Sequence, residues 1–316
     1  MAKLRKVPKA YQQVLDQHRR QLVRLTERGG VERAKKLYDE AQAVVTKRLR
    51  GLSRARETFT AQQKAQVMGQ IKQGQRMVAQ RMTGELGDLS KTAQTDALRG
   101  LVDNISRLEK HFTGSDIVLP IDEAARFRGI VDGRRESLLR SHAESIDNYG
   151  DVLVGKMEDQ LSLSMVAGEH YGEAIERIED TAGLEWWQGE RIVRTELVGA
   201  FNATAYDGMR EMGRELDDLG MRWVEYVDDD TGEPRDDRVS DDSLAMHGQV
   251  APVSGRFYFP NTMPGGEPLP KSCQVYVGKS WLFPPLRPNG RESISPWRPH
   301  WGIPAWRFAN GRRVEM

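Results

Sequence analysis

Apolar residues recur at three- and four-residue steps along most of the first 220 positions, a spacing that predicts long amphipathic helices. Gly29-Gly30 indicates a break, after which we expect a helix of about 25 residues from about Val31. Thr60 and Gln63 form a capping-box pattern, which predicts that a further helical region begins there and ends at residues 113–115. The apolar stripe of the helix after Val31 consists of Ala34, Leu37, Tyr38, Ala41, Val44, Val45, Leu49 and Leu52.

The period of the pattern changes near residue 221. Residues 221–227 alternate as a half-buried strand does, and residues 257–259 and 275–277 are two more short strand candidates. Most of the 14 prolines and four of the seven tryptophans lie beyond residue 250, which indicates an extended tail. The fold class that we predict is α+β, mainly α: long N-terminal helices, a helical middle domain, then a small β-sheet with a proline- and Trp-rich extended C-terminal tail.

The chain is long enough for two or three domains, because cores beyond roughly 150 residues tend to split. We expect a basic helical arm in residues 1–115, a helical domain in 116–220, and the small sheet with its tail in 221–316. No apolar run approaches the roughly 20 residues that span a bilayer, and the polar start lacks the core of a signal peptide. We therefore expect a cytosolic protein without membrane contact. The single cysteine, Cys273, excludes an internal disulfide.

Basic and acidic residues are separated along the chain, although the net charge is only +1. Residues 1–82 carry 20 Lys and Arg against 6 Asp and Glu, a net charge of +14, which leaves −13 on the remainder. This asymmetry predicts a basic arm that meets an anionic partner, either DNA or an acidic protein. The arm lacks interleaved aromatic residues for base stacking, so both partners stay open. The candidate contact residues are Lys3, Arg5, Lys6, Lys9, Arg19, Arg20, Arg24 and Arg28.

A group of polar residues stands among packing residues in the segment 190–206. Helical spacing places Arg191 and Arg194 on one face, and Glu196 follows two positions later. A guanidinium fork can hold a carboxylate or loop carbonyls through two hydrogen bonds. No second acid, nucleophile or oriented histidine accompanies the group in the sequence. We therefore interpret it as a buried clamp that fixes the following sheet to the helix, and we predict no catalysis.

The order of these elements resembles the Mu F-like minor head protein family of tailed bacteriophages. In that family a helix with an Arg-Thr-Glu element and a downstream Asn precedes a strand, an acidic turn and a His-Gly pair. The agreement covers about residues 186–290, a third of the chain. The corresponding residues here are Arg194-Thr195-Glu196, Asn202, Trp223-Val224, the turn from Asp228 to Arg238, and His247-Gly248.

The resemblance implies a structural minor head protein rather than an enzyme. Such a protein is made in the host cytoplasm and sits in the virion, at the portal inside the capsid, where it aids head assembly, DNA packaging or DNA ejection. The implied partners are the phage portal protein and the major capsid protein. The alternative function is that of a DNA-binding packaging or ejection factor, which contacts double-stranded DNA without sequence specificity through the basic arm.

The sequence gives little support to a metal site. Many members of this family carry closely spaced cysteines after a proline-rich loop, whereas Gly290 and Glu292 occupy the corresponding positions here. Four-ligand zinc therefore lacks donors. The acidic residues between 228 and 242 lack the regular alternation of a calcium loop, and we expect a solvated turn. His247 has no histidine at a pairing distance along the chain, so we interpret it as structural and predict no cofactor.

Overall fold

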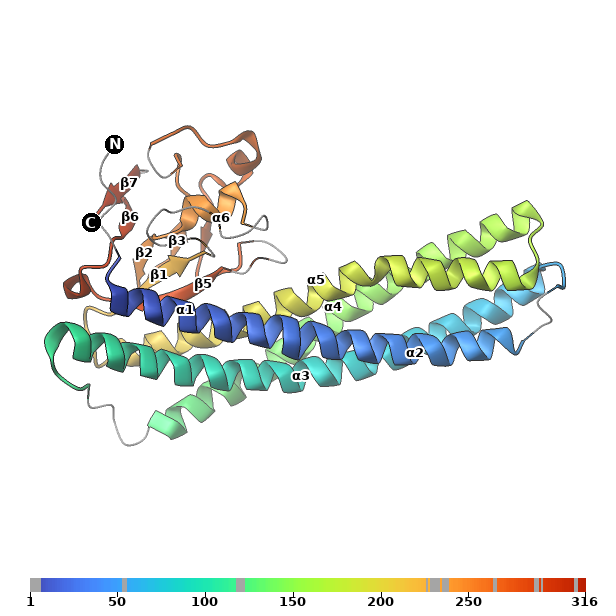
Figure 1. Cartoon of the computed structure of the whole chain (residues 1–316), viewed down its shortest axis with the longest axis horizontal. Coiled ribbons are helices and arrows are strands. Elements are labelled where there is room, and N and C mark those ends of the chain that lie inside the picture. Colours follow the sequence, from blue (N-terminus) through green and yellow to red (C-terminus); the bar gives the residue numbers. More distant parts are fainter. Residues whose placement is uncertain are drawn as a thin grey trace. The chain divides into compact units, whose positions relative to one another are not determined.

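Helices dominate the structure, and small antiparallel sheets follow toward the C-terminus (Figure 1), which confirms the predicted α+β, mainly α class. The long helices are α1 (Lys9–Val23), α2 (Glu32–Arg50), α3 (Ala61–Thr113), α4 (Glu123–Ala167) and α5 (Tyr171–Met212). The structure is a computed structural model that describes residues 7–52, 56–117, 123–225, 227, 234, 239–263, 266–286, 290, 292–309 and 312–316.

The chain forms two compact units, and each is assembled from separate segments. The helical unit consists of Thr26–Leu89 and Glu136–Glu196, and the sheet unit consists of Met1–Leu25, Ser90–Arg135 and Leu197–Met316. Helices α3, α4 and α5 each contribute residues to both units. These units differ from the three consecutive domains that we expect from the sequence, because one long helix can supply apolar residues to two separate cores.

Local sequence signals set both ends of α3. The amide N of Thr60 donates to Gln63 Oε1 at 2.9 Å, and the amide N of Gln63 donates to Thr60 Oγ1 at 3.3 Å, which confirms the capping box. The helix ends at Thr113, and Gly114 follows with a φ of 76°. Glycine adopts this left-handed conformation without steric strain, so the predicted end is confirmed as well.

The predicted break at Gly29-Gly30 is wrong. Residues Arg24–Val31 form a π-helical segment that continues α1 directly into α2. A π-helical turn widens a helix without ending it. Gly30 is buried in this segment, as are Leu25 and Thr26. The packing of the segment thus outweighs the weak helix propensity of two glycines.

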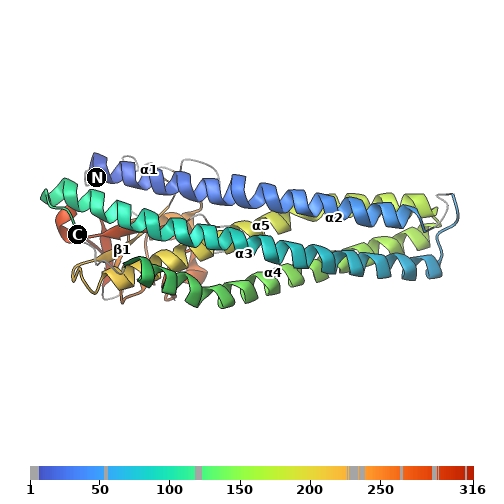
Figure 2. The same cartoon turned by 90° about the horizontal axis from the view of Figure 1, so that it is seen from below.

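In the helical unit, parts of α2, α3, α4 and α5 lie side by side (Figure 2). Gly74 of α3 permits a close approach to α2, because a Cβ atom at this position would lie 2.3 Å from Cγ2 of Val45. Val67, Ile71 and Met82 of α3 are buried. The apolar stripe of α3 therefore faces the core of this unit, as an amphipathic helix requires.

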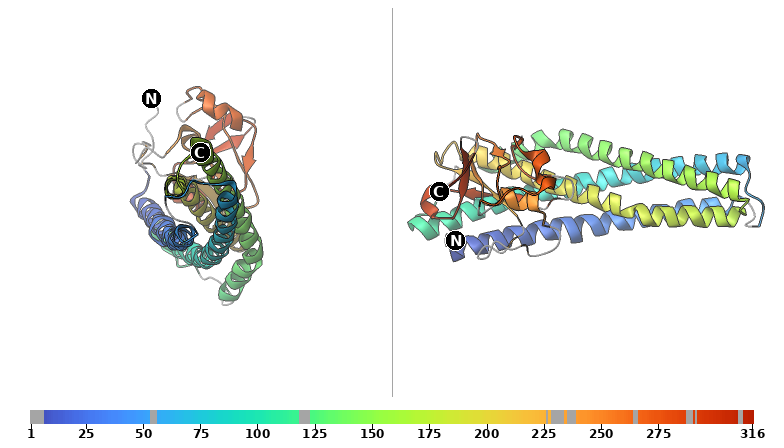
Figure 3. Two further views of the ribbon diagram at one scale, coloured as in Figure 1. Left: turned by 90° about the vertical axis from the view of Figure 1, so that its right-hand side faces the viewer. Right: turned by 90° about the horizontal axis from the view of Figure 1, so that it is seen from above.

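The sheet unit contains a three-stranded antiparallel sheet in the order β2-β1-β5. Figure 3 draws the strands of this unit as arrows. Strand β1 (Gly220–Val224) pairs with both β2 (Val250–Pro252) and β5 (Ser293–Trp297). Strands near residues 221 and 257 are confirmed, although β1 ends at Val224 and all five of its residues are buried, so it is not the half-buried strand that we predict. The remaining elements are α6 (Asp241–Met246), the pair β3 (Phe257–Tyr258) and β4 (Ser280–Trp281), and the hairpin β6 (Trp306–Ala309) and β7 (Arg312–Glu315).

Two expectations for the C-terminal part are wrong. Residues Lys271–Tyr276 form a 3₁₀ helix, not a strand, with Cys273 buried and Val275 62% exposed. The β-branched side chain of Val275 does not pack against a neighbouring strand, so its strand propensity does not decide the structure. The tail is also not extended, because β5 joins the central strand β1 and the β6–β7 hairpin follows. Trp301 and Trp306 are fully buried and form part of the core.

Candidate functional site

The Arg194 side chain connects two helical segments within the helical unit. Its Nε donates to Glu27 Oε1 at 2.9 Å and its Nη2 donates to Glu27 Oε2 at 2.6 Å, and Glu190 forms a further ion pair with it. The side chain of Arg191 is instead exposed, with its guanidinium carbon 5.7 Å from the ring centre of Trp187. Arg191 therefore does not belong to a buried clamp.

Glu196 also acts between helices. Its carboxylate accepts hydrogen bonds from the hydroxyl of Ser145 at 2.7 Å and of Ser141 at 3.1 Å, and Nε2 of His142 lies 3.5 Å away. All three partners lie on α4. The interpretation of Arg191, Arg194 and Glu196 as a clamp between helix and sheet is thus corrected, because Arg194 and Glu196 bind helices only.

The contact between helix and sheet comes from Asn202, a fully buried residue of α5. Its Nδ2 donates to the carbonyl oxygen of Glu292 at 2.8 Å, and its Oδ1 accepts from the amide N of Ile294 at 3.3 Å. One side-chain amide therefore satisfies two backbone groups at the start of β5. This is the role that the sequence pattern led us to expect of the arginines.

Asp242 and Glu292 are buried acidic residues near the same strand. Ser243 donates its hydroxyl proton to Glu292 Oε1 at 2.5 Å, and Asp242 Oδ1 accepts from the amide N of Ser243 at 3.1 Å. Glu292 thus connects α6 to the start of β5. The rest of the predicted acidic turn, residues 228–233 and 235–238, lies outside the described residues.

His247 follows α6 and holds two chain segments. Its Nδ1 accepts from the amide N of Glu225 at 3.1 Å, and its carbonyl oxygen accepts from Trp306 Nε1 at 2.8 Å. Burial holds the pKa of His247 well below its usual value of 6.5, and the guanidinium groups of Arg222, Arg19 and Arg313 lower this pKa further. The imidazole is therefore neutral near pH 7, in keeping with the structural role that we predict for it.

Arg222 is a residue of this site that the sequence does not reveal. It is only 2% exposed, its guanidinium carbon lies 5.5 Å from the ring centre of Tyr11, and its Nη2 lies 3.5 Å from His247 Nε2. The alternation in residues 221–227 predicts a polar, solvated face for Arg222, whereas all five residues of β1 are buried. Helix α1 covers that face, since the hydroxyl groups of Tyr11 and Ser295 are hydrogen-bonded at 2.5 Å. No local signal in the sequence predicts that α1 packs over this face of β1.

Only some of the basic side chains predicted to form the contact surface are exposed. Lys9, Arg20 and Arg24 are exposed on the helix that begins with α1. Arg19 is 7% exposed, its Nη2 donates to the carbonyl oxygen of Glu225 at 2.8 Å, and its Nη1 lies 3.7 Å from Asp16. The assignment of Arg19 to the contact surface is therefore wrong. Lys3, Arg5 and Lys6 lie outside the described residues, as does the side chain of Arg28.

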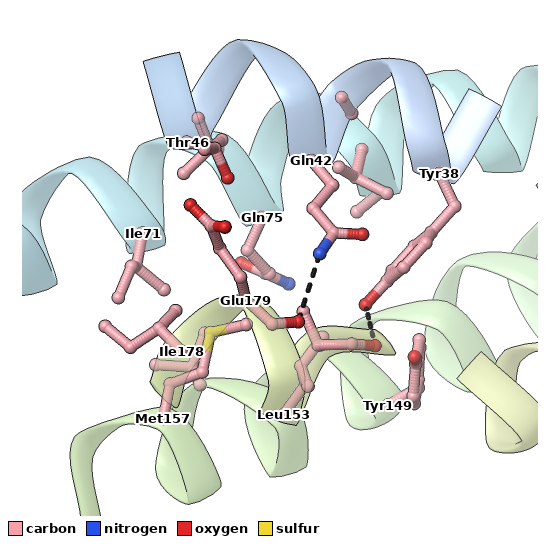
Figure 4. Close-up of a pocket in the computed structure, with 18 of the residues that line it drawn as sticks. Tyr38, Gln42, Thr46, Ile71, Gln75, Tyr149, Leu153, Met157, Ile178 and Glu179 are labelled. Carbon is pink, nitrogen blue, oxygen red and sulfur yellow. Dashed lines mark hydrogen bonds between the residues drawn. The ribbon is translucent and has the colours of Figure 1, made fainter. Parts of the chain in front are cut away.

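The helical unit contains an apolar cavity of about 80 Å³ between α2, α3, α4 and α5 (Figure 4). Two polar side chains at its edge bind backbone: the Tyr38 hydroxyl donates to Ala182 O at 2.9 Å, and Gln42 Nε2 donates to Glu179 O at 3.3 Å. Burial raises the pKa of Tyr38 to about 12, so the hydroxyl keeps the proton that it donates. The apolar lining includes Ile71, Val78, Leu153, Met157 and Ile178.

No family model, curated protein or solved structure matches this chain. Within the described residues, no helix combines the length and the apolarity needed to cross a membrane. The same part of the chain holds no group of three or more His, Cys, Asp or Glu side chains arranged to bind a metal ion.

Proposed function

We propose that this protein is a structural minor head protein of a tailed bacteriophage, bound at the portal inside the capsid, where it aids head assembly, DNA packaging or DNA ejection. The observation that carries the proposal is that the residues on which the family resemblance rests make structural contacts. Asn202 and His247 each bind the backbone of a separate segment, and Arg194 and Glu196 bind neighbouring helices.

These contacts support a structural role over a catalytic one. A catalytic side chain needs a lone pair or a proton that can reach substrate. The Asn202 amide is fully buried and bonds backbone through both its oxygen and its nitrogen, and the Nδ1 lone pair of His247 accepts from a backbone amide. Residues with these contacts stabilise the fold. This is the role that we expect of shared residues in a family of structural proteins.

The test of the portal contact uses substitutions on α1 and the segment that follows it, where the described candidate contact residues of the basic arm lie; α2 belongs to the same arm but holds none of these candidates. Deleting α1 is unsuitable, since its residues Tyr11 and Leu15 are fully buried and their loss would unfold the sheet unit. The triple variant Lys9→Gln, Arg20→Gln and Arg24→Gln removes exposed charge only. The matched control is Lys35→Gln, Lys36→Gln and Lys47→Gln on α2, where all three side chains are exposed.

Copurification with the portal protein of the same phage is the measurement. If the candidate residues dock on an acidic portal, the α1 triple variant no longer copurifies with the portal protein and is incorporated into fewer heads. The α2 control should copurify with the portal protein and be incorporated as the wild type is. The same assay with the major capsid protein tests the second partner. Wild-type protein that binds neither protein at low salt contradicts the proposal.

The second candidate function, sequence-independent DNA binding, rests on the exposed side chains of Lys9, Arg20 and Arg24. Among the described residues, none of these three forms an ion pair, so their charges are available to phosphates. Binding to duplex DNA should weaken with salt with a slope near −0.9 in log affinity for each phosphate neutralised. The α1 triple variant should flatten this slope by about 0.9 for each phosphate that it no longer neutralises. An unchanged slope excludes the arm as the DNA surface.

A further inference from the structure

The guanidinium of Arg222 is a buried positive charge that the protein does not neutralise in the part of the chain that the structure describes. Neither its Nε nor its Nη1 has a hydrogen-bond partner there, and no carboxylate lies within ion-pair distance of the side chain. Arginine stays protonated in proteins, so the charge cannot be removed by deprotonation. A buried guanidinium in this state is strongly unfavourable unless an acceptor is supplied.

The imidazole beside it presents a second donor. Nδ1 of His247 accepts from the amide N of Glu225, so the proton of the neutral ring resides on Nε2. That Nε2–H group lies 3.5 Å from Nη2 of Arg222, which carries protons only. Two donors cannot bond to each other. This contact between two donors is a gap that no acceptor among the described residues fills.

Further positive charge surrounds the gap. Arg19 reaches the backbone of Glu225, next to the site, and the Arg313 guanidinium lies 4.4 Å from the ring centre of Trp306, whose Nε1 bonds to the carbonyl oxygen of His247. The site thus joins α1, β1, the turn after α6 and the C-terminal hairpin. An anion held here would connect four segments that are distant in sequence.

We propose that Arg222 and His247 Nε2 bind a small oxyanion of the phosphate class. An oxygen about 2.8 Å from each donor can bridge the 3.5 Å between Nη2 and Nε2, and a second oxygen can accept from the remaining guanidinium protons. Duplex DNA does not fit, because Arg222 is 2% exposed and a phosphate of a rigid double helix cannot reach it. The occupant is a free ion, and its role is to complete the fold of the sheet unit.

Inorganic phosphate is the probe, with the full chain and with chloride at matched ionic strength as reference. Thermal unfolding of the wild type should shift upward with rising phosphate in the logarithmic manner of a ligand that binds the folded state. Calorimetric titration should give one phosphate per chain, and sulfate should compete. Wild-type protein that responds equally to phosphate and chloride overturns the proposal.

Variants locate the site. Arg222→Met should abolish the phosphate response, and the exposed control Arg191→Met should retain it. Should Arg222→Met fail to fold, Arg222→Lys keeps the charge but loses the two-pronged contact, and it should bind phosphate about tenfold more weakly. An Arg222→Met or Arg222→Lys protein with wild-type phosphate affinity places the ion elsewhere and refutes the assignment.

Discussion

Arg194 and Glu27 form a two-pronged ion pair, with both guanidinium–carboxylate hydrogen bonds at 2.9 Å or less. The pair joins the π-helical segment to α5 across 167 positions of sequence. Arg194 is 12% exposed and Glu27 is 28% exposed, so water screens the pair only in part. The π-helical segment thus supplies a carboxylate partner of Arg194.

Replacing Arg194 by Ala should destabilise the full-length protein by about 1–2 kcal/mol, because Glu27 and Glu190 would lose their partner. Urea denaturation measures the change. Arg191→Ala is the control one turn away, and its exposed side chain should leave stability within about 0.5 kcal/mol. Equal losses for the two variants would contradict the role given to the ion pair. The measurement needs the full-length protein, since a fragment that begins after Glu27 lacks this partner of Arg194.

Replacing Asn202 by Ala should lower the free energy of unfolding by about 2–4 kcal/mol, because the carbonyl of Glu292 and the amide of Ile294 would stay buried without partners. Hydrogen exchange at the amide of Ile294 should accelerate at the same time. The exposed Asn148→Ala variant controls for the loss of an asparagine from a helix. Slow exchange at Ile294 in the Asn202→Ala protein would argue against this contact.

Stability should fall as the pH drops below about 6.5, and His18 should account for part of this. Burial, together with the positive charge of the neighbouring Arg19, lowers the pKa of His18 to about 4. The unfolded chain binds a proton at His18 below pH 6.5, whereas the folded chain does not until about pH 4, so protons favour unfolding in this window. Full stability is present above pH 6.5 and declines by up to about 1.4 kcal/mol per pH unit for this group.

Urea denaturation at several pH values between 4 and 7 checks this linkage. His18→Leu should flatten the slope of unfolding free energy against pH, because the buried imidazole is gone. The control is His170→Gln, which removes a histidine with an exposed side chain. A slope that is the same in His18→Leu and in the wild type would show that His18 does not contribute.

The cavity of the helical unit should respond to side-chain size. Ala41→Val adds apolar atoms to a buried lining position of α2 and should stabilise the protein by about 1 kcal/mol. Leu153→Ala enlarges the cavity and should destabilise by about 2–5 kcal/mol. Thermal unfolding of both variants measures the difference. Destabilisation by Ala41→Val would indicate that the cavity closes in solution.

The sequence by itself determined the elements whose causes are local. The capping box of Thr60 and Gln63 involves residues three positions apart, and the end at Gly114 follows from the conformation of one glycine. The apolar stripes of the helices and the alternation in β1 repeat over a few residues, so they could be predicted directly. Asn202 and His247 were singled out by the family resemblance alone, which did not give their partners.

Only the tertiary structure decided what depends on residues far apart in sequence. Because the segment around Gly30 is buried, the helix continues through the break that we predict there. Residues that we predict as an extended tail form β5, which pairs with the central strand β1. Arg194 binds Glu27 in place of the sheet, and α1 covers a strand face that alternation had left to solvent, so that Arg222 became buried. Such outcomes follow from which surfaces the packed chain removes from water, and a local pattern does not carry that information.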